Sequence, residues 1–274
     1  SPLVDLFLIQ ENEYSLKGEK KGLWANEILK EERFKPFLHK VVVISAQQEI
    51  HQGHTDESNN FAREGWQRTI CYNTLCQVCQ SLDDIILVSD VDEFICPDTD
   101  FRKSSLLENF ERFKDHPSWV MRRRFWYSIE NECRLRTIRI PVLRWQHILD
   151  KPDALPQSRH YHDQERTFGT YENPLAFEYS YYFPTIDGIK EKKKNYSHTG
   201  FDDESISNAL KLNCWCRPKS RGEKINPETD YFELIDLTEE NSPVYVREHF
   251  NELKTNIVDP NYKENRKSWT SEYT

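Results

Sequence analysis

Three acidic residues stand close together directly after an apolar run: Asp90, Asp92 and Glu93 follow residues 85–88. Carboxylates this close repel one another and raise each other's pKa unless a cation neutralises them. Carboxylate oxygens are the hard ligands that Mg²⁺ and Mn²⁺ prefer, and such ions commonly bind phosphate oxygens as well. We therefore expect Asp90 and Asp92 to hold Mn²⁺ or Mg²⁺ beside a phosphorylated ligand. The alternative is an acidic turn that binds no ion.

A buried strand is the element that would position these carboxylates. Residues 85–88 are consecutively apolar and mostly β-branched, which is typical of a strand covered on both faces of a parallel sheet. Residues 4–9 and 41–45 have the same character. We expect these three strands to be neighbours in one largely parallel sheet, with the acidic residues at a carboxyl end, where open α/β sheets bind ligands.

The rest of the chain alternates between helical and strand-like patterns, which favours a single α/β domain. Residues 151–164 are rich in Pro and His and are expected to form a loop, and the polar residues after Pro260 a frayed tail. Helices are expected over residues 23–33, 61–81, 104–113, 189–194, 202–211 and 243–253, and strands over 120–129, 136–148 and 175–183.

Composition excludes several classes of protein. The net charge of −9 argues against nucleic-acid binding, which usually requires a basic surface. No apolar run approaches the roughly 18 residues of a membrane span, and no signal-peptide core is present. The 7 cysteines are scattered and odd in number, unlike a disulfide scaffold. Together these features favour a soluble, cytoplasmic chain, although its compartment stays open because an N-terminal segment is expected to be missing.

Several blocks, in order along the chain, resemble glycosyltransferase family 17, which includes the β-1,4-mannosyl-glycoprotein 4-β-N-acetylglucosaminyltransferases. Residues 4–11, followed by Gly18 and Leu23, are similar to the family's opening block, and residues 63–68 to its Arg-Glu-x-x-Gln-Arg helix start. The acidic motif at residues 89–93 resembles the family's metal motif. Later similarities are found at residues 177–183, 194–199 and 243–253.

The resemblance implies a GT-A-type fold, a Rossmann-like mixed sheet with flanking helices in a single domain over residues 1–262, and a polar tail over 263–274. An earlier strand–helix block that members usually carry is expected to be missing. The resemblance also implies a UDP-GlcNAc donor, a saccharide or glycan acceptor, a divalent metal and inversion at the anomeric carbon.

The same resemblance assigns roles to individual residues. The metal ligands are Asp90, Asp92 and His198. The donor-binding residues are Glu11, Gln67, Arg68, Asp90 and Lys194. The candidate catalytic bases are Glu178, Asp202 and Asp203, because they flank segments similar to the acceptor side of the family.

Two other functions are compatible with the residues. A phosphohydrolase of the haloacid-dehalogenase type also places Asp-x-Asp after four apolar residues and would use Asp90 as its nucleophile. A saccharide-binding module without catalysis is the second alternative, because Gly200 stands where the family pattern has Glu.

Overall fold

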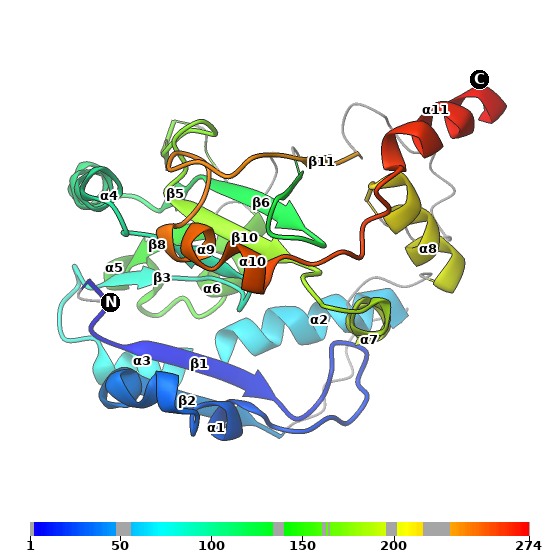
Figure 1. Ribbon diagram of the computed structural model, residues 1–274. Coiled ribbons are helices and arrows are strands. Elements are labelled where there is room, and N and C mark those ends of the chain that lie inside the picture. The colour runs from blue at the N-terminus through cyan, green and yellow to red at the C-terminus, as the bar shows by residue number, and fades with distance from the viewer. Residues whose placement is uncertain are drawn as a thin grey trace.

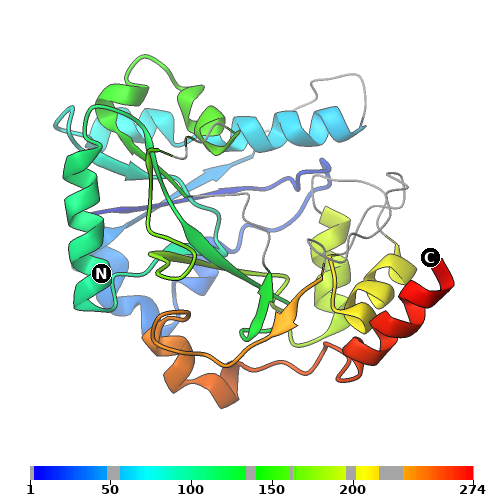
Figure 2. The ribbon, with the colours of Figure 1, turned by 90° about the horizontal axis from the view of Figure 1, so that it is seen from above.

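The computed structural model is a mixed α/β domain in which strands occupy the centre and helices surround them (Figures 1 and 2). The structure describes residues 3–47, 56–133, 140–160, 163, 165–195, 202–215 and 231–273. Hydrogen bonding divides the described strands into a parallel pair, a five-stranded sheet and a four-stranded sheet. The predicted fold class, a single α/β domain with mixed sheets and flanking helices, is confirmed.

The parallel pair consists of β1 (Phe7–Asn12) and β2 (Val41–Ala46), with Phe7 opposite Val41. The expected strand at 41–45 is confirmed, and the expected strand at 4–9 lies about three residues further along the chain. Between the two strands run α1 (Ala25–Ile28) and the 3₁₀ helix η1 (Glu32–Lys40). A single helix over 23–33 was therefore the wrong prediction.

The five-stranded sheet is ordered β11-β7-β6-β10-β4. Its central pair, β6 (Arg122–Trp126) and β10 (Ala176–Ser180), is parallel, and β4 (Glu93–Ile95) is antiparallel to β10. The remaining strands are β7 (Asn131–Cys133) and β11 (Glu233–Leu234). Because side chains alternate along a strand, this pairing places Glu93, Arg122, Arg124 and Glu178 on one face, and Arg123 on the other.

The four-stranded sheet is ordered β3-β8-β5-β9 and corrects a central expectation. Strand β3 (Ile85–Leu87) pairs with β8 (Ile140–Arg144) in antiparallel fashion at the edge of this sheet, not with β1 or β2. Ile85 is 40% exposed and Leu87 37% exposed, so only the opposite face is packed. On that face Ile86 contacts the cluster around Leu143. The other members are β5 (Ser118–Val120) and β9 (Thr167–Phe168).

Several helices differ from the sequence-based expectation. The helix expected over 61–81 is divided into α2 (Asp56–Thr69) and α3 (Tyr72–Val78). The long strand expected over 136–148 ends at Arg144, and α5 (Trp145–Ile148) follows it, while 134–139 lie outside the described residues. The expected loop 151–164 contains α6 (Ala154–His160).

The C-terminal helices complete the domain. They are α7 (Ile186–Asn195), α8 (Asp203–Leu212), α9 (Val244–Glu248), α10 (Phe250–Leu253) and α11 (Tyr262–Tyr273). The expected frayed tail was wrong, because α11 docks on the domain: Arg266 donates from Nε to the carbonyl of Leu212 (2.6 Å) and from Nη1 to Glu233 (2.9 Å). None of the described helices has the length and apolarity needed to cross a membrane.

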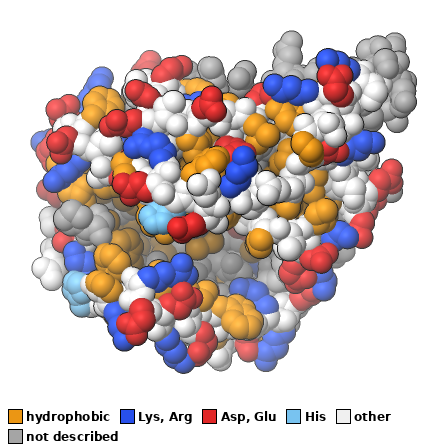
Figure 3. Space-filling view, in the orientation of Figure 1, with side chains coloured by type: hydrophobic (Ala, Val, Ile, Leu, Met, Phe, Trp, Pro, Cys, Tyr) orange, Lys and Arg blue, Asp and Glu red, His pale blue; other side chains and the backbone are white. Residues whose placement is uncertain are grey.

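Acidic and basic side chains are interspersed over the described part of the face in Figure 3. The core under the five-stranded sheet is rich in aromatic rings: Trp126 lies 4.7 Å from Tyr181 and 5.3 Å from Phe232, centroid to centroid. Such edge-to-face pairs add about 1 kcal/mol each beyond the area they bury.

A matched pair of leucines on α4 (Asp100–Arg112) tests how this helix packs on the four-stranded sheet. Leu106 is 1% exposed and packs against Val120 and Ile140, whereas its neighbour Leu107 is 46% exposed. Leu106→Ala should lower the free energy of unfolding by about 3 kcal/mol, because it leaves a cavity. Leu107→Ala should change it by no more than about 0.5 kcal/mol. Urea denaturation of both variants measures the difference, and equal losses would contradict the described burial.

Candidate active site

The acidic motif lies where the chain crosses from one sheet to the other. Strand β3 belongs to the four-stranded sheet and β4 to the five-stranded sheet, and residues 88–92 connect them. The connection is held at both ends: Val88 N–H donates to Pro141 O (3.2 Å) and Tyr179 N–H donates to Asp92 O (3.0 Å). Between them, Glu93 N–H donates to Asp90 O (3.0 Å), which closes a tight turn.

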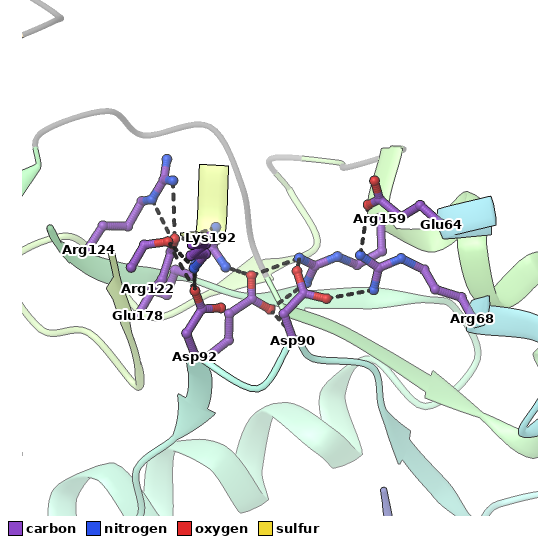
Figure 4. Close-up of polar contacts among 11 residues, drawn as sticks. Glu64, Arg68, Asp90, Asp92, Arg122, Arg124, Arg159, Glu178 and Lys192 are labelled. Atoms are coloured by element: carbon purple, nitrogen blue, oxygen red, sulfur yellow. Dashed lines mark hydrogen bonds and ion pairs between the residues drawn. The ribbon is translucent and has the colours of Figure 1, made fainter. Parts of the chain in front are cut away.

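Two arginines hold the first carboxylate of the motif (Figure 4). Arg68, in the last turn of α2, donates to Asp90 Oδ1 (2.8 Å), and Arg159 of α6 donates to Asp90 Oδ2 (2.9 Å). Burial raises the pKa of Asp90, but the charges of Arg159 and Arg68 outweigh it, so this pKa lies below its ordinary value. Asp90 is therefore ionised at neutral pH.

The second carboxylate of the motif binds a lysine. Lys192 Nζ of α7 lies 2.8 Å from Asp92 Oδ2 and Ser180 Oγ donates to the same oxygen (3.0 Å). Ser180 is the last residue of β10, so Asp92 joins the two elements β10 and α7.

Glu93 is the most deeply buried member of the motif, with 2% of its side chain exposed. Arg159 forms a two-pronged pair with it, at 2.6 and 2.7 Å, and Arg122 contacts its Oε1. Charges this deep in a protein require close partners of opposite sign. Glu93 thus links the acidic turn to both α6 and β6.

Glu178 extends the buried network across the sheet. It lies opposite Glu93 on β4 and opposite Arg124 on β6, so all three side chains point to the same face. Its Oε2 lies 2.7 Å from Arg122 Nη2 and 2.6 Å from Arg124 Nε. Burial lowers the pKa of Arg122 to about 10, against the opposing effect of Glu178, so the guanidinium stays charged at neutral pH.

The structure brings together some of the predicted site residues. Arg68, Asp90 and Glu178 belong to one continuous network of ion pairs, which runs through Arg159, Glu93 and Arg122. The pair of Asp92 with Lys192 lies beside this network (Figure 4). Gln67, one residue before Arg68, instead donates to Tyr14 O at 3.4 Å.

Other predicted site residues have contacts outside this network. The Glu11 carboxylate accepts from the backbone of Trp24 and Ala25 at the start of α1. Lys194 is 62% exposed and lies 3.9 Å from Glu19. His198 lies outside the described residues.

The candidate bases Asp202 and Asp203 lie at the start of α8. Asp202 caps this helix by accepting from Ser205 N–H (2.8 Å), and Asp203 pairs with Lys190 (2.9 Å). Glu178, the third candidate, is 4% exposed and bound between two arginines. These contacts give Asp202 and Glu178 clear structural roles, and their catalytic role stays a prediction.

Apart from Arg68, the basic residues of the site were not predicted from the sequence. Arg159 comes from residues expected to be a loop, and no local pattern marks it. Arg122 and Arg124 could have been found, because they alternate with other residues along a strand and therefore share a face. Lys192 lies in the basic stretch of α7, where the sequence pointed to Lys194 instead.

The same contacts test whether the site suits a divalent metal. Among the described residues, no group of three His, Cys, Asp or Glu side chains is placed to hold an ion. Mg²⁺, however, is usually bound by one or two carboxylates and completed by phosphate oxygens of the substrate. Asp92 is the better ligand for that arrangement, because two arginines already engage both oxygens of Asp90. The chemistry therefore fits a metal that arrives with a phosphorylated ligand.

A cavity of about 570 Å³ lies elsewhere, next to β11 and α10. Glu130, Asp236, Arg247 and Lys254 supply its charged lining, with Lys254 and Glu130 paired at 3.0 Å. No residue of the ion-pair network described above lines it. We place the candidate site at the acidic turn on chemical grounds.

Replacing Arg159 tests the network. Arg159→Met should lower the free energy of unfolding by about 3 kcal/mol, because it removes one of two partners of the buried Glu93. Arg33→Met is the control, since Arg33 is 69% exposed and pairs only at the surface with Glu31; it should cost at most about 0.5 kcal/mol. Chemical denaturation gives both values. A loss for Arg159→Met as small as that of the control would show that the network does not stabilise the fold.

Comparison with known proteins bears on this site. No curated protein and no solved structure matches the chain. The family model described as Glycosyltransferase family 17 matches residues 1–235, which include the acidic turn and the arginines and the lysine that pair with it. The resemblance inferred from the sequence blocks is thereby confirmed. The chain belongs to glycosyltransferase family 17.

Proposed function

We propose that the protein is a metal-dependent, inverting glycosyltransferase of GT-A type that moves GlcNAc, or a closely related sugar, from a UDP-sugar to a saccharide hydroxyl. The family assignment supports a glycosyltransferase and implies a sugar donor and an acceptor. The observation that carries the proposal is the acidic turn: Asp90 and Asp92 lie at a junction of two sheets, flanked by Arg68, Arg159 and Lys192.

The side chains of the acidic turn and their basic partners can each contribute to such a reaction. When the donor sugar departs, negative charge develops on the diphosphate, and preorganised cations stabilise it most effectively. A bound Mn²⁺ or Mg²⁺ would supply further positive charge there, held by Asp92. Arg68 and Arg159 keep Asp90 ionised and fixed in place. In this position Asp90 can contact the bound metal or accept a hydrogen bond from a ribose hydroxyl.

Attack by the acceptor hydroxyl requires a base on the opposite side of the sugar. The candidates stay Glu178, Asp202 and Asp203. Asp203 is the most accessible of the three, since 77% of its side chain is exposed. A base differs from a binding residue in that its loss lowers turnover and leaves donor affinity unchanged.

The phosphohydrolase alternative has little support. The family assignment favours glycosyl transfer, and both carboxylate oxygens of Asp90 accept from guanidinium groups, which weakens it as a nucleophile. A binding module without catalysis would bind saccharide and release no UDP, so the experiment below distinguishes it as well.

Assays of UDP release test the proposed function. The protein, incubated with Mn²⁺ and a mannose-containing glycan, should release UDP from UDP-GlcNAc faster than from other UDP-sugars, and EDTA should stop the release. Transfer to the glycan is detected by a mass increase of one N-acetylhexosamine. Release of inorganic phosphate from aryl phosphates, without UDP release, would contradict the proposal.

Asp92→Asn tests the role of the second carboxylate without changing side-chain volume. It should lower turnover by about 100-fold or more, because the diphosphate loses a metal-mediated contact in the transition state. Asp100→Asn is the control, an exposed aspartate in the first turn of α4, and should retain full activity. Calorimetric titration of both variants with UDP and Mn²⁺ separates binding from chemistry. Equal metal-dependent affinity in Asp92→Asn and the parent protein would refute the assignment of Asp92 as metal ligand.

A further inference from the structure

Lys192 is bound to the carboxylate of Asp92, the residue to which we assign the metal. Its ammonium lies 2.8 Å from Asp92 Oδ2 and 3.3 Å from Ser180 Oγ, and 4.7 Å from the centre of the Tyr181 ring. The side chain is 29% exposed, so it is accessible to a ligand in the site. The Lys192 ammonium is therefore already bound to Asp92 Oδ2, an oxygen of the proposed metal ligand.

The backbone around this ammonium is unusual. The parallel strands β6 and β10 end in register, and the next residue of each, Tyr127 and Tyr181, has a positive φ of 67° and 54°. A bulky residue in this left-handed region costs about 1–3 kcal/mol and is found preferentially at functional sites. At Tyr181 this conformation sets the ring beneath Lys192, and the ring's negative face attracts the ammonium.

The carboxylates of the site are already neutralised by basic side chains, and this affects how a metal ion can bind. Asp90, Asp92, Glu93 and Glu178 are all paired with basic side chains. A divalent ion approaching Asp92 alone would have to displace Lys192 and leave its ammonium without its carboxylate. A diphosphate that arrives with the metal supplies new anionic oxygens for that ammonium. The flexible four-carbon stem of lysine allows such a change of partner.

We propose that Lys192 is a resident counter-ion of Asp92 that makes metal binding conditional on the donor: it leaves Asp92 for the diphosphate when metal and nucleotide bind together. The inference rests on the proposed function, because the diphosphate is that of the nucleotide-sugar donor. Lys192 then has two roles, blocking the metal position in the free protein and binding the leaving group in the complex.

Metal titrations without nucleotide test the first role directly. Free Mn²⁺, followed by its electron paramagnetic resonance signal, should bind Lys192→Met at least ~10-fold more tightly than the parent protein, since the competing ammonium is gone. Lys192→Arg keeps the charge and should bind Mn²⁺ as weakly as the parent. Lys211→Met, an exposed lysine of α8, is the matched control and should change nothing. Adding Asp92→Asn to Lys192→Met should abolish the gain.

Titrations with UDP at saturating Mn²⁺ test the second role. Lys192→Met should bind UDP ~10-fold more weakly or worse, because one charge-assisted contact to phosphate is lost. Circular dichroism confirms that each variant is folded, and Lys192→Gln replaces Lys192→Met if the latter is not. Unchanged or weaker binding of Mn²⁺ alone in these variants would overturn the inference. Because that measurement uses no nucleotide, it stands even if the protein binds no UDP, a result that would refute the proposed function instead.

Discussion

The buried carboxylate of Glu93, shared between Arg122 and Arg159, is the interaction on which the site depends. Glu93 begins β4 of the five-stranded sheet, Arg122 begins β6 of the same sheet, and Arg159 comes from α6. A charge with 2% of its side chain exposed cannot be left without a partner, so these three elements must meet at one point. The acidic turn before β4 is built on that meeting point, and the positions of Asp90 and Asp92 follow from it.

This network divides the acidic residues of the site into two groups. Glu93 and Glu178 are buried and bind arginines of the sheet and of α6, which is a structural role. Asp90 and Asp92 lie further out, with 41% and 22% of their side chains exposed, and face the cations of three different helices. Of these four residues the outer pair is the more accessible to a ligand, and its charge is already balanced by side chains.

The crowded carboxylates were expected to need a metal ion, yet side-chain cations already balance their charge. Of these cations the sequence pointed only to Arg68, because they are spread over residues 68, 122, 124, 159 and 192. The prediction of a buried strand at residues 85–88 also used neighbouring residues alone. Four consecutive apolar residues are equally consistent with a half-exposed edge strand, and β3 is one. An apolar run by itself does not say how many layers will cover it.

The sequence alone determined those properties that depend on neighbouring residues: the mixed α/β class, the strand at 41–45, the helix at 202–211, and the acidic motif with the family blocks around it. These follow from local periodicity, capping chemistry and motif spacing, all of which act within a few residues. Tertiary structure alone decided that β3 lies at an edge, that residues after Pro260 dock as α11, and that Arg159 and Lys192 reach the acidic turn. The physical reason is that burial and ion pairing depend on which distant segments meet, and electrostatic partners at separations of 66 and 100 residues leave no local pattern.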